Sequence, residues 1–353
     1  MSVLIAIHNR SGSFSDRWIE YCQQHGIKHI IVNCHNTDII DQLRKADALL
    51  WSWHLCEPAD QLVARQLISV VELTGVRTFP NALTSWHYDD KIAQKYLLEA
   101  VDAPLVPSYV FFHKEDALGW ISQATFPKVF KLRCGAGSDN VRLVRNRRAA
   151  IQLCHKMFGK GLPSSSANYF RDFRRKVRQT KGWGHFFEKL KRMPAVVREI
   201  FYQWKHLPRQ LNYMYFQDYL PNNTHDTRVA VIGNRAFAFI RMNRPGDFRA
   251  SGSGRLVYES SKIDIRCVRI ALDVSKKIDV QSMAYDFIFD EHGEPKIVEI
   301  SYTYMAKAVY DCAGYWDPDL LWHEGHYWPQ DLILTDLLDA LSPKSINTEA
   351  GNE

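Results

Sequence analysis

The chain has 353 residues, of which 46% are hydrophobic and 24% charged, with a formal net charge of +6. These values are ordinary for a globular protein of about two domains. Its seven cysteines are odd in number and never spaced as paired ligands, which argues against a disulfide framework and a zinc site.

The first 88 residues predict a doubly wound α/β domain with a parallel sheet. Apolar runs of strand length alternate with helical patterns, at 3–7, 18–25, 27–32, 37–45, 48–51 and 59–73. The loop carrying Gly12 follows the first strand at its carboxyl end, where open α/β sheets bind ligands, although a plain connection is the alternative. No charged region precedes the first apolar run and no run approaches the ~18 residues of a spanning helix, so we expect a cytoplasmic protein.

A lysine-bearing strand and a small-residue loop follow at 126–138. The strand carries Lys128 and Lys131, and the loop contains Gly135, Gly137 and Ser138. Glycines let backbone N–H groups approach phosphate oxygens, and a lysine on the preceding strand can reach the same anion. A simple tight turn is the alternative, because the run is neither a Walker loop nor a full dinucleotide fingerprint.

The segment 145–209 is strongly basic. It holds 17 Lys or Arg residues against three acids, a net +14, so the rest of the chain sums to about −8. Aromatic residues recur there at helical spacing, which predicts a basic helical insertion that meets an anionic membrane surface, at the inner face of the membrane, or an acidic glycan. A solvated insertion packed on its own domain is the alternative. Nucleic acid is not expected, because no recognition motif accompanies the charge.

The run 286–301 predicts an acidic β-hairpin. Apolar segments at 287–289 and 297–300 flank a turn at Glu291-His292-Gly293. Asp286 and Glu299 then lie roughly opposite each other with the same strand parity. Two carboxylates that close repel unless a proton or cation lies between them, and hard oxygen ligands suit Mg²⁺. An acidic surface hairpin is the alternative.

In motif order, residues 90–301 resemble the ATP-grasp superfamily, especially the branch of glutathione synthetase-like and glutamate-adding ligases. The resemblance implies an ATP-grasp fold of two subdomains after the α/β domain. Its expected units are 1–88, 89–214 with the insertion 145–209, 215–342, and a disordered tail at 343–353.

The resemblance also implies roles for individual residues. Phosphate-binding residues would be Lys91, Lys131, Gly135, Gly137 and Ser138. Residues that hold adenine would be Gln217, Asp218, Tyr219 and Leu220, with Asp226 at the ribose. Residues that neutralise charge on the moving phosphoryl group would be Arg241 and Arg249, and the Mg²⁺ ligands would be Asp286, Glu299 and Ser301. The family usually has Asn at the last position, and a serine hydroxyl is a shorter and weaker ligand.

The function implied is an ATP- and Mg²⁺-dependent ligase that joins a carboxylate to an amine through an acylphosphate. The runs 247–254, 299–302 and 314–317 further resemble uncharacterised ATP-grasp proteins of bacterial surface polysaccharide biosynthesis, which suggests a sugar acid as substrate. Two alternatives remain: a nucleotide-binding protein without ligase activity, and a membrane-peripheral scaffold that acts through the basic segment.

Overall fold

The computed structural model describes residues 3–55, 57–135, 140–163, 209–244, 248 and 254–342. Most of the basic insertion (164–208), the tail 343–353 and the candidate residues Gly137, Ser138 and Arg249 therefore lie outside the described residues. Among the helices that are described, none is both long and apolar enough to cross a membrane.

The N-terminal domain is built on a parallel sheet in the order β2-β1-β3-β4. Its strands are β1 (Leu4–His8), β2 (Lys28–Val32), β3 (Ala48–Leu50) and β4 (Arg77–Phe79), and its helices are α1 (Phe14–Gln24), α2 (Ile39–Leu43), α3 (Pro58–Leu73) and α4 (Ala82–Ser85). The expected doubly wound domain is confirmed, with β4 as a strand that the sequence pattern did not indicate.

Strand alternation in this sheet divides its side chains between two cores. Ile5 and Ile7 pack in the same cluster as Trp18 of α1. Ala6 and Leu49 face the other way and pack in the cluster that contains Ile68 of α3 and residues of α2. Helices therefore cover both faces, which leaves the carboxyl ends of the strands as an accessible edge.

A second, antiparallel sheet has the order β5-β10-β6-β7. Its strands are β5 (Ser108–Phe111), β6 (Lys128–Lys131), β7 (Val141–Val144) and β10 (Met214–Asp218), and α6 (Lys114–Gln123) and α7 (Arg147–Met157) pack on one face. The short strands β8 (Leu162–Pro163) and β9 (Arg209–Gln210) pair beside it. The subdomain boundary expected at 214/215 is wrong, because it would cut β10; the chain leaves this sheet after Asp218.

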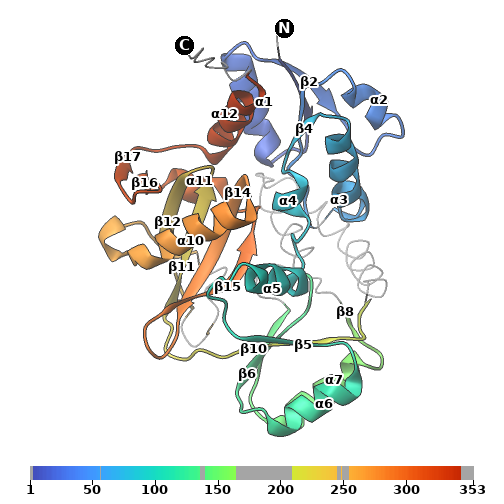
Figure 1. Ribbon diagram of the computed structural model, residues 1–353, viewed down its shortest axis with the longest axis vertical. Coiled ribbons are helices and arrows are strands. Elements are labelled where there is room, and N and C mark those ends of the chain that lie inside the picture. Colours follow the sequence, from blue (N-terminus) through green and yellow to red (C-terminus); the bar gives the residue numbers. More distant parts are fainter. Residues whose placement is uncertain are drawn as a thin grey trace, which may run out of the picture.

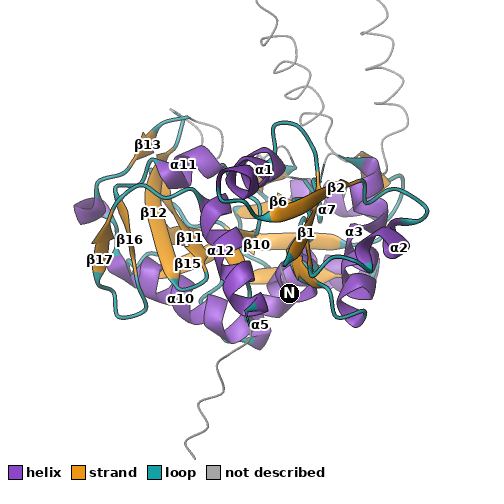
Figure 2. Cartoon of the chain, turned by 90° about the horizontal axis from the view of Figure 1, so that it is seen from above, coloured by secondary structure: helices purple, strands orange, loops and turns teal. Residues whose placement is uncertain are grey.

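The third sheet has the order β15-β14-β11-β12-β16-β17, with β13 paired to β12. Its strands are β11 (His225–Ile232), β12 (Arg235–Met242), β13 (Leu256–Val257), β14 (Ser282–Phe289), β15 (Pro295–Ser301), β16 (Gly314–Trp316) and β17 (Trp322–Glu324). The remaining helices are α5 (Lys91–Ala100), η1 (Ser260–Lys262), α10 (Ile265–Ile278), α11 (Ala306–Tyr310) and α12 (Pro329–Leu341). Figures 1 and 2 show α10 along one face of this sheet, where it packs on Val229 and Tyr285.

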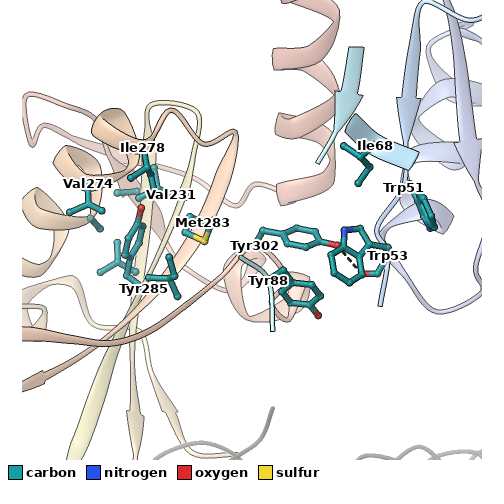
Figure 3. Close-up of a cluster of buried hydrophobic side chains, with 14 of the residues drawn as sticks. Trp51, Trp53, Ile68, Tyr88, Val231, Val274, Ile278, Met283, Tyr285 and Tyr302 are labelled. Atoms are coloured by element: carbon teal, nitrogen blue, oxygen red, sulfur yellow. Dashed lines mark hydrogen bonds between the residues drawn. The ribbon is translucent and has the colours of Figure 1, made fainter. Parts of the chain in front are cut away.

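Hydrogen bonds and an ion pair join the N-terminal domain to the third sheet and to helix α12, among them the hydrogen bonds of Gln281, just before β14, with Thr78, Asn81 and Thr84. Helix α12 returns to lie beside α1 (Figure 1), where the Trp18 indole donates to the Gln330 carbonyl at 3.0 Å and Arg17 pairs with Asp331 at 2.7 Å. The Tyr302 hydroxyl, just beyond β15, donates to the Trp53 carbonyl at 2.8 Å (Figure 3). The third sheet and the first are therefore held in a defined arrangement.

Candidate active site

The predicted acidic hairpin is present as β14 and β15. Asp286 and Glu299 are direct partners across the two strands, and a β-bulge follows Asp286. The turn is closed by Asp290, whose carboxylate accepts from two backbone N–H groups at 2.9 Å, and Gly293 adopts a φ of +73°. A positive φ is easy for glycine and costly for other residues, which fixes the turn at this position.

Two arginines from neighbouring strands hold Asp286. Arg228 lies opposite Asp286 in the β11–β14 pairing and donates two hydrogen bonds to it, at 2.7 and 2.8 Å. Arg241 contacts the same carboxylate at 2.7 Å. Burial by itself raises the pKa of Asp286, but the two guanidinium groups outweigh it and hold the pKa below its usual range. Asp286 is therefore ionised at neutral pH.

A second carboxylate, that of Asp226, also binds Arg241. Both of its oxygens accept from the Arg241 guanidinium, at 2.6 and 2.5 Å, so Asp226 orients that group toward Asp286. The contact of Asp226 with ribose stays a prediction.

On the other side of the hairpin, Lys91 connects three segments. It begins α5, and its ammonium group lies 3.1 Å from Glu299 and 2.8 Å from the Gly135 carbonyl. The Gly135 N–H donates to the Asp89 carboxylate at 2.6 Å. Gly135 has a φ of +112°, and a Cβ there would lie 2.2 Å from the Asn140 amide nitrogen, so only glycine fits.

Lys131 and Lys128 point to opposite faces of their sheet, as strand alternation predicts. The buried Lys131 ammonium faces the hairpin, 3.4 Å from the Val298 carbonyl. Burial, aided by the nearby charge of Lys91, lowers the pKa of Lys131 to about 8. Lys128 instead pairs with Asp218 at 2.5 Å on the helix-covered face, over the rings of Tyr109 and Trp120.

The segment expected to hold adenine joins the second sheet to the third. Gln217 is buried, and its amide donates to the Ser108 hydroxyl at 3.1 Å. Tyr219 packs edge-on against Phe248, with ring centroids 5.8 Å apart, and the Leu220 carbonyl accepts from Asn223. Asp218 turns away to Lys128, and the adenine-binding role of the other three residues stays a prediction.

Ser301, the third expected Mg²⁺ ligand, shares strand parity with Glu299. Its hydroxyl donates to the Thr303 carbonyl at 2.8 Å and accepts from the Thr303 N–H at 3.3 Å. One lone pair remains for a metal, so the oxygen-only set of Asp286, Glu299 and Ser301 fits the ligands that Mg²⁺ prefers. The role of Ser301 as a ligand stays a prediction.

Sequence reasoning assigned no role to Arg228 or Asp89. The signal for Arg228 was present, since Arg228 lies two positions after Asp226 and therefore has the same parity on a strand. Asp89 directly precedes the helix cap and adopts a φ of +55°, which the sequence does not reveal. Both residues complete the charged cluster around Asp286 and Glu299.

Comparisons with known proteins bear on the family and the fold. Residues 205–309 match the family model described as a RimK-like ATP-grasp domain, a range that carries Asp226, Arg241 and the hairpin. A comparison with curated proteins found no match.

Several solved structures share the fold. The chain superposes with a TM-score of 0.58 on D-alanine–D-alanine ligase from Bacillus anthracis complexed with ATP, at 12% identity, covering 97% of this chain and 98% of that one. It superposes with a TM-score of 0.57 on the biotin carboxylase–β,γ-ATP complex from Campylobacter jejuni, at 14% identity, covering 94% of this chain and 70% of that one. A RiPP-associated ATP-grasp ligase from Chryseobacterium gregarium, bound to ADP and a peptide, gives a TM-score of 0.56 at 12% identity. That match covers 97% of this chain and 98% of the ligase. The resemblance to the ATP-grasp superfamily is thus confirmed as a shared fold.

The arginine cluster generates a stability prediction. Arg241→Met leaves Asp226 without its partner and Asp286 with one arginine fewer in a buried setting, which should lower the free energy of unfolding by about 3–5 kcal/mol. Arg235→Met removes a more exposed pair with Asp336 and should cost about 1 kcal/mol or less. Urea unfolding of the unaltered protein and the two variants measures both losses of stability. Equal losses would contradict the burial of the Asp226–Arg241–Asp286 cluster.

Proposed function

We propose that this protein is an ATP-dependent ligase that joins a carboxylate to an amine through an acylphosphate intermediate. The observation that carries the proposal is the meeting of charged groups from separate parts of the fold at one hairpin. Lys91 of α5, Lys131 of the second sheet and the Asp286–Glu299 pair of the third converge there. Such a cluster is suited to binding a polyphosphate together with a divalent cation.

The proposed place of ATP follows from these positions. The triphosphate would lie against Lys91 and Lys131, beside Gly135. The adenine would lie at the junction of the two sheets, beside Gln217 and the backbone of 219–220. Support for this arrangement comes from the shared fold and from the burial of the Lys131 ammonium, which disfavours leaving that charge without an anion.

Asp286, Glu299 and Ser301 would hold Mg²⁺, which when bound neutralises charge on the phosphates. Arg228 and Arg241 keep Asp286 ionised and fix its orientation. Arg241 also adds positive charge next to the expected phosphate position, which favours a transition state whose negative charge is spread over the moving phosphoryl group.

In the proposed reaction, a substrate carboxylate oxygen attacks the γ-phosphorus of ATP. The bond from the γ-phosphorus to the bridging oxygen breaks and ADP leaves, giving an acylphosphate. The amine nitrogen then attacks the acyl carbon, the carbon–oxygen bond to phosphate breaks, and the proton lost from nitrogen goes to the departing phosphate. Excluding water in the interval protects the acylphosphate from hydrolysis.

For the carboxylate substrate we propose a sugar acid of a bacterial surface glycan. The support is the sequence resemblance in 299–302 and 314–317, together with the aromatic and polar residues of β16 and β17. Tyr315 stacks on His323 there, with ring centroids 4.8 Å apart, and Trp322 is partly exposed. Aromatic faces beside polar groups suit a pyranose ring.

The hairpin carboxylates give the decisive test of function. Asp286→Asn and Glu299→Gln should each lower ADP formation by about 100-fold or more, because each removes a negative ligand at the reacting phosphates. Asp336→Asn is the matched control, since it changes an aspartate paired to Arg235 on the third sheet and should keep turnover.

Turnover is measured as ADP released with a carboxylate and an amine panel present together. ADP release that never rises when both are added would instead favour the nucleotide-binding protein without ligase activity. Unchanged turnover in both hairpin variants would overturn the site assignment.

Replacing each of the two lysines of β6 should affect ATP binding differently. Lys131→Ala removes a charge that faces the hairpin and should weaken ATP binding by about 1.5–3 kcal/mol, the contribution of a charge-assisted hydrogen bond. Lys128→Ala removes a charge on the opposite face and should leave nucleotide affinity nearly unchanged. Calorimetric titration with a non-hydrolysable ATP analogue distinguishes them, and equal losses would show that the wrong lysine is assigned.

The pKa of Lys131 gives ATP binding a pH dependence of defined sign. The ammonium is fully charged well below pH 8 and loses its proton as the pH rises through about 8. Affinity for the ATP analogue should therefore be highest below pH 8 and fall above it. Lys131→Arg should flatten this decline, because arginine stays charged throughout the range. A decline that is identical in the variant would assign it to another group.

A further inference from the structure

After β6 the chain leaves the second sheet and runs through residues 133–135 to the proposed place of the phosphates. The last hydrogen bond along this strand joins the Leu132 N–H to the Asn140 carbonyl, at 3.1 Å. Beyond it, residues 133–135 have no neighbouring strand to pair with in the part of the chain that the structure describes. Their backbone groups need other partners, because a backbone group removed from water and left unpaired costs about as much as a lost hydrogen bond.

The first two N–H groups of this stretch donate to side chains from a distant part of the sequence. The Arg133 N–H donates to the Tyr213 hydroxyl at 2.7 Å. The Cys134 N–H donates to the side-chain carbonyl of Gln210 at 3.4 Å. Both acceptors lie at 210–213, a segment to which neither the sequence pattern nor the proposed function assigns a role.

The remaining backbone groups of 133–135 are paired as well. The third N–H, that of Gly135, donates to the Asp89 carboxylate at 2.6 Å. The three carbonyls accept in turn from the Lys91 N–H at 3.0 Å, the Asn140 amide at 2.9 Å and the Lys91 ammonium at 2.8 Å. With all six groups satisfied, the conformation of this stretch is set by the elements around it.

Tyr213 and Gln210 act on this stretch as one unit. The Tyr213 hydroxyl donates to the Gln210 side-chain carbonyl, so the two acceptors are bonded to each other. The Tyr213 side chain packs in the apolar core of the second sheet. Burial raises the pKa of its hydroxyl, which keeps the proton of this hydrogen bond in place near neutral pH.

The segment that carries this unit is anchored independently of the stretch it supports. Gln210 belongs to β9, which pairs with β8. Gly161, just before β8, has a φ of +65°, and a Cβ there would lie 2.6 Å from the Gln210 carbonyl oxygen, so glycine permits the close approach. The Asn212 N–H donates to the carbonyl of Met157, the last residue of α7, at 2.9 Å. The fixed position of β9 can therefore determine where residues 133–135 lie.

We propose that Tyr213 and Gln210 are positioning residues for phosphate binding, which hold residues 133–135 so that the loop after β6 meets the triphosphate. The inference rests on the proposed function, in which the triphosphate lies beside Gly135. Gln210 directly follows the basic segment 145–209 in the sequence. The same two side chains therefore connect the end of that segment to the nucleotide site, and a shift of β9 would change the affinity for ATP.

Removing the Tyr213 hydroxyl tests the proposal. Tyr213→Phe keeps the packed ring but leaves the Arg133 N–H without its acceptor and Gln210 without its donor. We expect the affinity for a non-hydrolysable ATP analogue with Mg²⁺, measured by calorimetric titration, to fall at least fivefold. In the free protein, the amides of residues 133 and 134 should exchange hydrogen faster than in the unaltered protein.

Tyr285→Phe is the matched control. The Tyr285 hydroxyl is also buried and lies 2.7 Å from the Ser275 hydroxyl, but strand alternation places it on the face opposite Asp286. Both variants lose one buried hydroxyl, so urea unfolding should show similar losses of stability. Only Tyr213→Phe should lose affinity for the ATP analogue, which separates positioning of the loop from a general loss of stability.

A second variant tests whether the two side chains act together. Gln210→Leu removes the other acceptor and should weaken binding of the ATP analogue by a similar factor. Because both side chains support one stretch, the double variant should bind about as weakly as the weaker single variant. Two independent contributions would instead multiply. If Tyr213→Phe does not fold, Gln210→Leu carries the same comparison with Tyr285→Phe.

The inference is overturned if Tyr213→Phe and Gln210→Leu bind the ATP analogue as tightly as Tyr285→Phe does, or if their losses multiply in the double variant. Its failure is distinguishable from that of the proposed function. Equal binding by all variants, with tight binding by the unaltered protein, would remove the positioning role alone. An unaltered protein that does not bind the analogue would overturn the proposed function and this inference with it.

Discussion

The ion pair between Lys91 and Glu299 is the interaction on which the candidate site depends. The same ammonium group also donates to the Gly135 carbonyl, so one side chain ties α5, the hairpin and the loop after β6 together. Burial by itself lowers the pKa of Lys91, but Glu299 and Asp89 outweigh it and raise the pKa. A buried charge is tolerated only with such partners. The need to pair the Lys91 ammonium therefore keeps α5, the hairpin and Gly135 next to one another.

The charged groups around the hairpin balance in number within the part of the chain that the structure describes. The four acids Asp89, Asp226, Asp286 and Glu299 face the four bases Lys91, Lys131, Arg228 and Arg241. Their pairing is uneven, because the Lys131 ammonium contacts the Val298 carbonyl at 3.4 Å and burial lowers its pKa to about 8. A polyphosphate would supply an anion to this ammonium and raise its pKa, whereas Asp286 stays ionised because two guanidinium groups hold it.

The local sequence pattern was sufficient to predict the features that depend on neighbouring residues. The two-residue period and Gly293 predicted the Asp286–Glu299 register, and the same period separated Lys128 from Lys131. It was insufficient where pairing is long-range. Arg228 meets Asp286 only because β11 pairs with β14, and β10 belongs to the second sheet only because it pairs with β5 and β6. No local pattern encodes which distant strand will be the neighbour.

The distribution of apolar cores indicates which part of the site is rigid. Trp53 and Tyr302 share one core, and Trp18 and Leu334 share another, so the N-terminal domain and the third sheet are packed as one unit. The core of the second sheet, around Phe130 and Phe216, contains no residue of the third sheet in the part of the chain that the structure describes. Moving the second sheet against the third would therefore break polar contacts such as that of Lys131 with the Val298 carbonyl rather than expose a shared apolar core. In this arrangement the N-terminal domain and the third sheet keep a fixed geometry, and the second sheet is the element that can adjust its position relative to them.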